Sequence, residues 1–191
     1  MKKVLSLFLM ALWSLNAQAQ ADLQLNNKQS AINFVSIKKS TVGEVHHFKS
    51  LSGTYRNGEA KVEIDLSSVE TSIPIRNKRM QNMLFDVSQY PLATITTKLD
   101  SATLDKLNVG QYIQEKLDLT LNLHGIVNKV SATVNIVKLS NNVILVYSVY
   151  PVMINASDYG LAKGIEALKA IAKLPSISTA VPITFSLVFN K

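Results

Sequence analysis

Hydrophobic and polar residues alternate with a period of two along much of the chain. Four segments show the pattern most clearly: residues 61–66, 117–124, 130–136 and 181–189. Successive side chains of a strand point to opposite faces, so each segment has one dry face and one wet face. Such a pattern is typical of an antiparallel sheet with one solvated side, and it predicts a mainly β fold.

Weaker strand patterns fill the gaps between these segments. They cover residues 30–38, 44–55, 93–99 and 143–152. Asn57-Gly58 is a tight-turn dipeptide between two strand candidates and predicts a hairpin. Asn141-Asn142 is a second turn candidate. Gly125 predicts a bulge or corner after the strand that precedes it.

Two short helices are predicted to interrupt the sheet. The first covers residues 75–85 and ends before Pro91. The second covers residues 161–174 and stops at Pro175. Its lysines and its apolar face suit a transient contact with a membrane surface. More often, such a face simply packs on a sheet.

About eight strands in one domain need their edges protected, and closure into a barrel removes the edges altogether. We therefore predict an eight-stranded antiparallel barrel. The interior of such a barrel is just wide enough either to be filled by side chains or to hold one ligand. The alternation alone leaves both options open, because a filled barrel and a hollow barrel need the same pattern.

The N-terminus has the pattern of a targeting segment. Lys2 and Lys3 precede a mostly apolar stretch, residues 4–15, that is too short to span a membrane. Ala17-Gln18-Ala19 is a small-x-small cleavage site, and Ala19-Gln20-Ala21 is an alternative. The chain has no Cys, which excludes a lipid-modified Cys and any disulfide. We expect a signal peptide over residues 1–19, one domain over residues 22–191, and a periplasmic or secreted protein.

The charged residues indicate little chemistry. Removal of Lys2 and Lys3 takes the formal charge from +7 to +5. The basic residues form no stripe interleaved with aromatics, so we expect no nucleic-acid partner. His46 and His47 point to opposite faces of a strand, and His124 is predicted on the polar face of another, so no metal site is expected. We predict no cofactor and no enzymatic activity.

One ordered set of motifs is more specific. Ser67-Ser68-Val69-Glu70-Thr71 is followed by Arg76, by Leu84-Phe85-Asp86-Val87 and by Tyr90-Pro91. In this order they resemble the YceI family of exported, lipocalin-like barrels that bind isoprenoid or other long-chain lipids. The likeness continues through residues 30–34, 121–127, 158–160 and 181–189. It departs from the family at Asn77, where an acidic residue is usual, at Lys38-Lys39, where a His is common, and at residues 95–97.

The resemblance implies an extended eight-stranded lipocalin-like barrel with two short helices and a lipid chain in its interior. Arg76, Lys78 or Arg79 would meet an anionic head group; the alternative is that all three are solvated helix residues. The candidate lining residues are Phe34, Leu119, Leu121, Leu123, Val134, Ile136, Phe185 and Leu187.

The function favoured by these observations is an exported protein that sequesters or carries an isoprenoid-like or fatty-acyl molecule. One alternative is a structural or interaction barrel with a filled core. The other is an enzyme that acts on a lipid, for which only His46, His47 and His124 offer acid–base chemistry near neutral pH. The oligomeric state and the identity of the ligand stay open.

Overall fold

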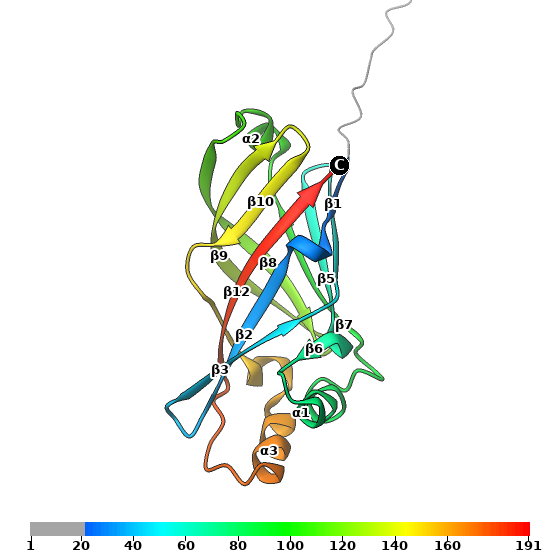
Figure 1. Cartoon of the computed structure of the whole chain (residues 1–191), viewed down its shortest axis with the longest axis vertical. Coiled ribbons are helices and arrows are strands. Elements are labelled where there is room, and N and C mark those ends of the chain that lie inside the picture. The colour runs from blue at the N-terminus through cyan, green and yellow to red at the C-terminus, as the bar shows by residue number, and fades with distance from the viewer. Residues whose placement is uncertain (1–21) are drawn as a thin grey trace, which may run out of the picture.

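The computed structural model describes residues 22–191, and these residues form one long antiparallel sheet with helices at its ends (Figure 1). The strands are β1 (Leu23–Leu25), β2 (Ala31–Lys38), β3 (Val42–Phe48), β4 (Leu51–Arg56), β5 (Glu59–Asp65), β6 (Val69–Glu70), β7 (Leu92–Lys98), β8 (Tyr112–Leu123), β9 (Ile126–Ser140), β10 (Val143–Ser148), β11 (Val152–Asn155) and β12 (Ala180–Asn190). The helices are α1 (Pro74–Arg79), α2 (Ser101–Asp105) and α3 (Ala162–Ile171), with short turns η1 (Asn27–Gln29), η2 (Leu66–Ser68), η3 (Met80–Leu84, π-helical) and η4 (Ala156–Tyr159).

The sheet closes on itself. Strands pair in the order β1-β4-β5-β7-β8-β9-β10-β12, and β12 pairs again with β1. This ring has eight strands, and every pairing in it is antiparallel. The predicted mainly β, eight-stranded antiparallel barrel is confirmed. Closure leaves no exposed edge in the ring, which is the physical reason for expecting it.

A second set of strands extends the wall beyond the ring. Strand β2 pairs with β12, β3 with β2, and β6 with β3. The single strand predicted over residues 44–55 is therefore two strands, because the chain changes partner at Lys49-Ser50. There the backbone N–H groups of both residues donate to Ser68, that of Lys49 to the carbonyl and that of Ser50 to the hydroxyl.

The strand predicted over residues 143–152 is also divided. Strand β10 pairs with β9 and β12, whereas β11 pairs with β12 alone. Pro151 lies between the two strands. It has no backbone N–H to give to a ladder, so the predicted continuous strand is interrupted there.

Two-residue turns set the register of the hairpins. Asn57 and Gly58 both have positive φ angles, of 51° and 78°, as a tight turn with the twist of a hairpin requires. The Asn57-Gly58 hairpin is therefore confirmed, and Asn141-Asn142 likewise separates β9 from β10. Gly125 makes a hairpin turn together with His124, which has a φ of 54°. The prediction that His124 lies on the polar face of a strand is therefore wrong, because this residue belongs to the turn.

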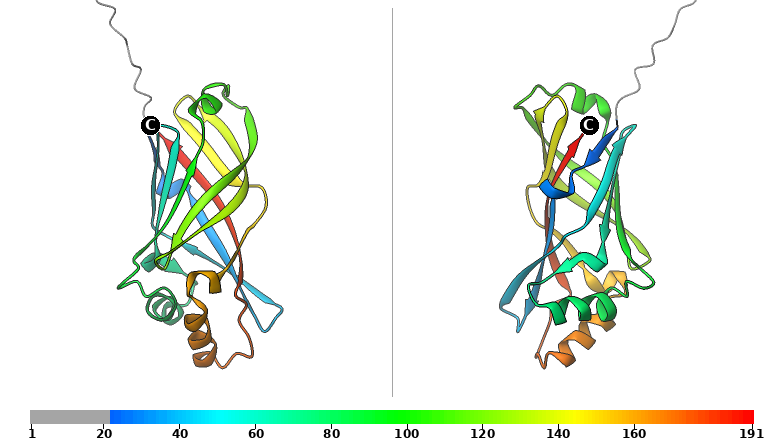
Figure 2. Two further views of the ribbon diagram at one scale, coloured as in Figure 1. Left: turned by 180° about the vertical axis from the view of Figure 1, so that it is seen from behind. Right: turned by 45° about the vertical axis from the view of Figure 1, so that its right-hand side comes forward.

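The helices lie at the two ends of the barrel. Segments α1 and η3 together correspond to the helix predicted over residues 75–85, and α3 to the one predicted over 161–174. Helix α2, which was not predicted, lies near the end where the chain terminates, whereas α1 and α3 lie at the other end (Figure 1, Figure 2). Helix α3 packs closely on η3: a Cβ atom added at Gly164 would lie 2.5 Å from the backbone oxygen of Met83. The sequence therefore needs a glycine at this crossing.

No helix within residues 22–191 is long and apolar enough to cross a membrane. The predicted signal peptide, residues 1–19, and both candidate cleavage sites lie outside the described residues.

Candidate functional site

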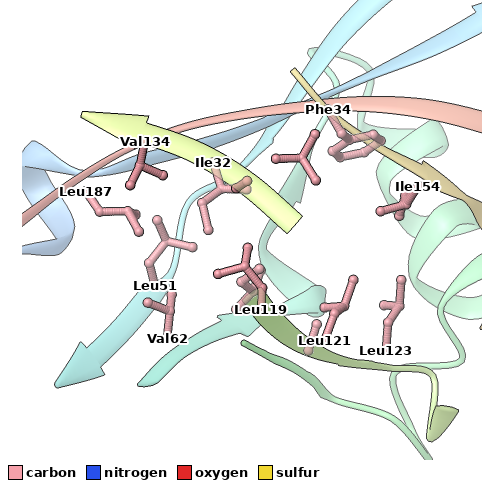
Figure 3. Packing of buried hydrophobic residues seen from close by; sticks show 14 of the residues in the cluster. Ile32, Phe34, Leu51, Val62, Leu119, Leu121, Leu123, Val134, Ile154 and Leu187 are labelled. Atoms are coloured by element: carbon pink, nitrogen blue, oxygen red, sulfur yellow. The ribbon is translucent and has the colours of Figure 1, made fainter. Parts of the chain in front are cut away.

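The end of the barrel that carries α1 and α3 encloses a cavity of about 450 Å³. Its wall comes from strands of both parts of the sheet, and α1, η3 and α3 close it below. Alternation along the strands determines which side chains face it. Ile32, Phe34, Ser36 and Lys38 of β2 all line the cavity, and Val35 also reaches it. Figure 3 shows Phe34, Leu121, Leu123 and Ile154 pointing toward one another across the interior.

A smaller cavity of about 100 Å³ continues the interior toward the other end of the barrel. Ile32, Ile95 and Ile183 line both cavities and so mark the narrow point between them. Around the smaller cavity the packing is tighter, since Val134 and Ile136 are 0% exposed. The interior is thus hollow at one end and nearly filled at the other. The alternation left a filled barrel and a hollow barrel open, and the structure combines the two.

One edge of the larger cavity is polar. The carboxylate oxygen Oε2 of Glu44 lies 2.9 Å from Nζ of Lys38 and 2.8 Å from Nη1 of Arg76. All three side chains are only about 25–30% exposed. The hydrogen bond from Lys38, helped by the charge of Arg76, holds the pKa of Glu44 below its usual range. This group therefore stays ionised at neutral pH.

His46 adds a buried neutral group beside this cluster. Its Nε2 atom lies 2.8 Å from Oγ of Ser36, and its ring packs edge-on against Phe34 at a centroid distance of 5.2 Å. Burial, and next the charge of Arg76, lower the pKa of His46. Its Nδ1 atom and Nε of Arg76 are buried and make no hydrogen bond to other described residues.

The motif that ends at Thr71 holds α1 against the sheet. Asn77 Oδ1 accepts hydrogen bonds from the backbone N–H and the hydroxyl of Thr71, at 2.9 and 2.6 Å, and Arg76 Nη2 donates to the Thr71 carbonyl at 2.6 Å. Asn77 also donates to Glu70, at 3.1 Å. Hydrogen bonds from Lys49, Asn77 and the backbone of Ser72 lower the pKa of Glu70 to about 2. The amide of Asn77 therefore supports the turn without adding a negative charge beside Arg76.

The structure brings all nine predicted ligand-binding residues to the interior, in two groups. Phe34, Leu121, Leu123 and Arg76 line the larger cavity. Those that line the smaller cavity are Leu119, Val134, Ile136, Phe185 and Leu187. Arg79 also lines the larger cavity, whereas Lys78 is exposed and does not. Contact of these residues with a ligand stays a prediction.

The sequence reasoning missed other lining residues. Ile32 shares the inward face of β2 with Phe34, so the alternation contained the signal for it. Met80, Ile165 and Leu168 come from helices and Leu161 directly precedes one, and such apolar faces could equally have packed on the outside of a sheet. Ile154 and Ile183 belong to the β11–β12 pair, for which the pattern gave no spatial partner.

The histidines do not come together. His46 is buried and His47, its neighbour on β3, is exposed. His124 packs against Tyr90 at a ring distance of 4.3 Å. Among residues 22–191 no group of three or more His, Asp or Glu side chains is placed to hold a metal ion.

Comparison with known proteins gives a consistent picture. Residues 23–189 match the family described as YceI-like domain. A structure described as a polyisoprenoid binding domain from Saccharophagus degradans, implicated in plant cell wall breakdown, is 41% identical, with a TM-score of 0.86, and the match covers 88% of this chain and 97% of that one. Among curated proteins no match was found.

Two more distant structures share the fold. BcnA from Burkholderia cenocepacia is 19% identical, with a TM-score of 0.64 over 86% of this chain and 98% of that one. The YCEI protein of Campylobacter jejuni is 17% identical, with a TM-score of 0.55 over 76% of this chain and 84% of that one.

Proposed function

Because this chain belongs to the family of YceI-like domains, we propose that it binds a polyisoprenoid or another long-chain lipid inside its barrel. The family match over residues 23–189 confirms the resemblance in the ordered motifs. The observation that carries the proposal is the larger cavity. It is apolar over most of its wall, and its volume of about 450 Å³ lies within the range of roughly 300–1,000 Å³ that is usual for small-molecule sites.

The energetics of such a site favour a chain over a compact ligand. Each CH₂ group that leaves water contributes about 0.8 kcal/mol, so a long chain binds tightly with few polar contacts. The smaller cavity beyond Ile32, Ile95 and Ile183 extends the available length.

The polar edge would receive the head of the lipid. Lys38 and Arg76 share one carboxylate, Glu44, so these three groups together carry one net positive charge. A head group with hydrogen-bond-accepting oxygens fits this surplus of charge. An isoprenoid with such a head group and a fatty-acyl molecule both meet this requirement, and the proposal covers both.

The predicted signal peptide supports a carrier role outside the cytoplasm. A protein exported to the periplasm or secreted would sequester a lipid and carry it through an aqueous compartment. The N-terminal sequence of the protein recovered from whole cells tests this part. A start at Gln20 or Asp22 supports export, and an intact Met1 contradicts it.

Native mass spectrometry tests the binding proposal. The protein is expressed with its own N-terminus, and whatever co-purifies is extracted into organic solvent. We expect one bound species that extracts as a long-chain lipid. A mass equal to the protein alone, unchanged when isoprenoid and fatty-acid probes are added, would instead favour a filled interaction barrel.

A matched pair of variants separates the interior from the surface. Ala93 of β7 is 2% exposed and faces the larger cavity, whereas Thr94 belongs to the opposite face of the same strand. Ala93→Phe places a ring in the cavity and should lower the bound fraction of lipid. Thr94→Phe should leave it unchanged. Equal binding by both variants and the parent would argue against the cavity as the site.

A further inference from the structure

The larger cavity opens to solvent between two helix ends. Ile73 and Ile75, at the start of α1, line the cavity and are 43% and 55% exposed. Ala172, directly after α3, lines the cavity and is exposed as well. Side chains that face both the cavity and the solvent mark its mouth.

Three segments, which we call the mouth rim, form one continuous surface around this opening: residues 38–45, 73–79 and 161–178. The Lys39 backbone N–H donates to the carbonyl of Ser176 at 3.1 Å, and that of Ser178 to the carbonyl of Ile37 at 2.8 Å. The Arg76–Glu44 salt bridge ties α1 to the same hairpin. All three segments lie at one end of the barrel (Figure 1, Figure 2).

The mouth rim exposes large apolar side chains. Besides Ile73 and Ile75, Ile171 is 44% exposed and Val42 is 39% exposed. Val42 belongs to the first segment of the rim, Ile73 and Ile75 to the second and Ile171 to the third, so every segment exposes an apolar side chain. Their exposure around the entrance of an apolar cavity is typical of an interaction surface.

The positive charge of the protein is concentrated in the same place. The mouth rim carries eight Lys or Arg residues and two Glu residues, a net charge of +6. The rest of residues 22–191 carries ten basic and eleven acidic residues, a net charge of −1. The asymmetry makes this end of the barrel attractive to a negatively charged surface.

From this combination we propose that the mouth rim docks on the surface of an anionic phospholipid bilayer. Basic side chains attract the lipid head groups, and the exposed Ile side chains enter the boundary between head groups and acyl chains. The proposal does not depend on the lipid in the cavity, because docking uses the rim alone. If the cavity also holds a lipid, docking places its mouth against the membrane.

Vesicle flotation tests the proposal directly. The purified protein is mixed with vesicles of phosphatidylcholine alone or of phosphatidylcholine with phosphatidylglycerol, at low and high salt. We expect flotation with the anionic vesicles only, weakened at high salt because surface charges are then screened. No flotation with anionic vesicles at low salt would overturn the proposal.

Paired variants locate the surface. Neutralisation of Lys78 and Lys173 to Gln should weaken binding about fivefold for each charge. Ile75→Ser should weaken it about tenfold, because an inserted apolar side chain is lost. Lys106→Gln with Val109→Ser, near α2 at the opposite end, removes a charge and an exposed apolar group and should leave binding unchanged. Equal loss in rim and control variants would contradict the proposal.

Bound lipid is measured on the same preparations. Loss of vesicle binding with an unchanged lipid content would show that docking and cavity binding are separate properties. A rim variant that lost its lipid and kept its vesicle binding would overturn the assignment of the rim as the docking surface.

Discussion

Arg76 of α1 and Glu44 of β3 are joined by a salt bridge of 2.8 Å at the mouth of the cavity. The two residues are 32 positions apart in the sequence. Since Lys38 reaches the same Glu44 oxygen from β2, one carboxylate connects the helix that closes the cavity to two strands of its wall. The contact orders the polar end of the proposed lipid site.

Replacement of Glu44 by Gln leaves both cations without a counter-charge. A double-mutant cycle of Glu44→Gln and Arg76→Gln, followed by urea unfolding, should give a coupling free energy of about 1 kcal/mol, because the pair is partly exposed. The stability from Glu44 is present above its ordinary pKa and is lost as the pH falls through the lowered pKa of the folded state. A coupling energy of zero would mean that the salt bridge does not hold α1.

His46 should make the protein less stable in mild acid. Its pKa is lowered in the folded state, so the unfolded chain binds more protons between that value and about 6.5, and stability falls as the pH drops through this window. Thermal unfolding of the parent and of His46→Gln at several pH values between 4 and 8 measures the effect. As the pH falls, the parent should lose more stability than the His46→Gln variant, because only the parent has a histidine to protonate at this position. A constant difference over this range would be inconsistent with a buried neutral histidine.

Gly164→Ala should destabilise the protein even though Ala is the better helix former. The new Cβ atom would lie 2.5 Å from the Met83 oxygen and 2.8 Å from Cα of Leu84, so α3 must move away from η3. We expect a loss of about 1–3 kcal/mol in the free energy of unfolding. Ala170→Gly, at an exposed position of the same helix, should cost only about 1 kcal/mol through helix propensity. A stabilised Gly164→Ala variant would show that the two helices do not pack this closely.

Truncations along the barrel should differ between its two ends. Ile136 is 0% exposed and borders only the smaller cavity, where the packing is tighter, so Ile136→Ala should cost about 3–5 kcal/mol. Leu123 already borders the larger cavity, and Leu123→Ala should cost about 2 kcal/mol in the lipid-free protein, because fewer contacts are lost. Chemical denaturation of both variants after delipidation tests this gradient. Equal large losses would indicate a filled barrel throughout.

The period-two pattern predicted the antiparallel sheet, and the need to protect its edges together with the family resemblance predicted its closure into a barrel. Leu121 and Leu123 are two positions apart on β8, so their common inward face follows from strand geometry alone. The break at Lys49-Ser50 was harder to predict, because it depends on a hydrogen-bond partner, Ser68, that the local sequence does not reveal. The break near Pro151 follows from the missing backbone N–H of proline.

The site was predicted only in part. The sequence pattern and the family resemblance point to Phe34 and Arg76, but not to the division of the interior into a hollow end and a packed end. The strands at both ends have the same alternation. One end is hollow because α1, η3 and α3 cover it without filling the space between them and the strands. The Lys38–Glu44–Arg76 cluster likewise depends on tertiary pairing that no local pattern encodes.

We propose that one lipid chain occupies the barrel interior, from the polar edge through the larger cavity toward the smaller one. Nuclear Overhauser effects between a bound polyisoprenoid and the labelled methyl groups of the protein test this most directly. We expect effects at Leu121, Leu123 and Ile154 in the larger cavity and, for the longest chains, at Leu187 beyond the narrow point. Effects confined to exposed methyl groups such as those of Val45 or Val127, or none at all with saturating lipid, would contradict it.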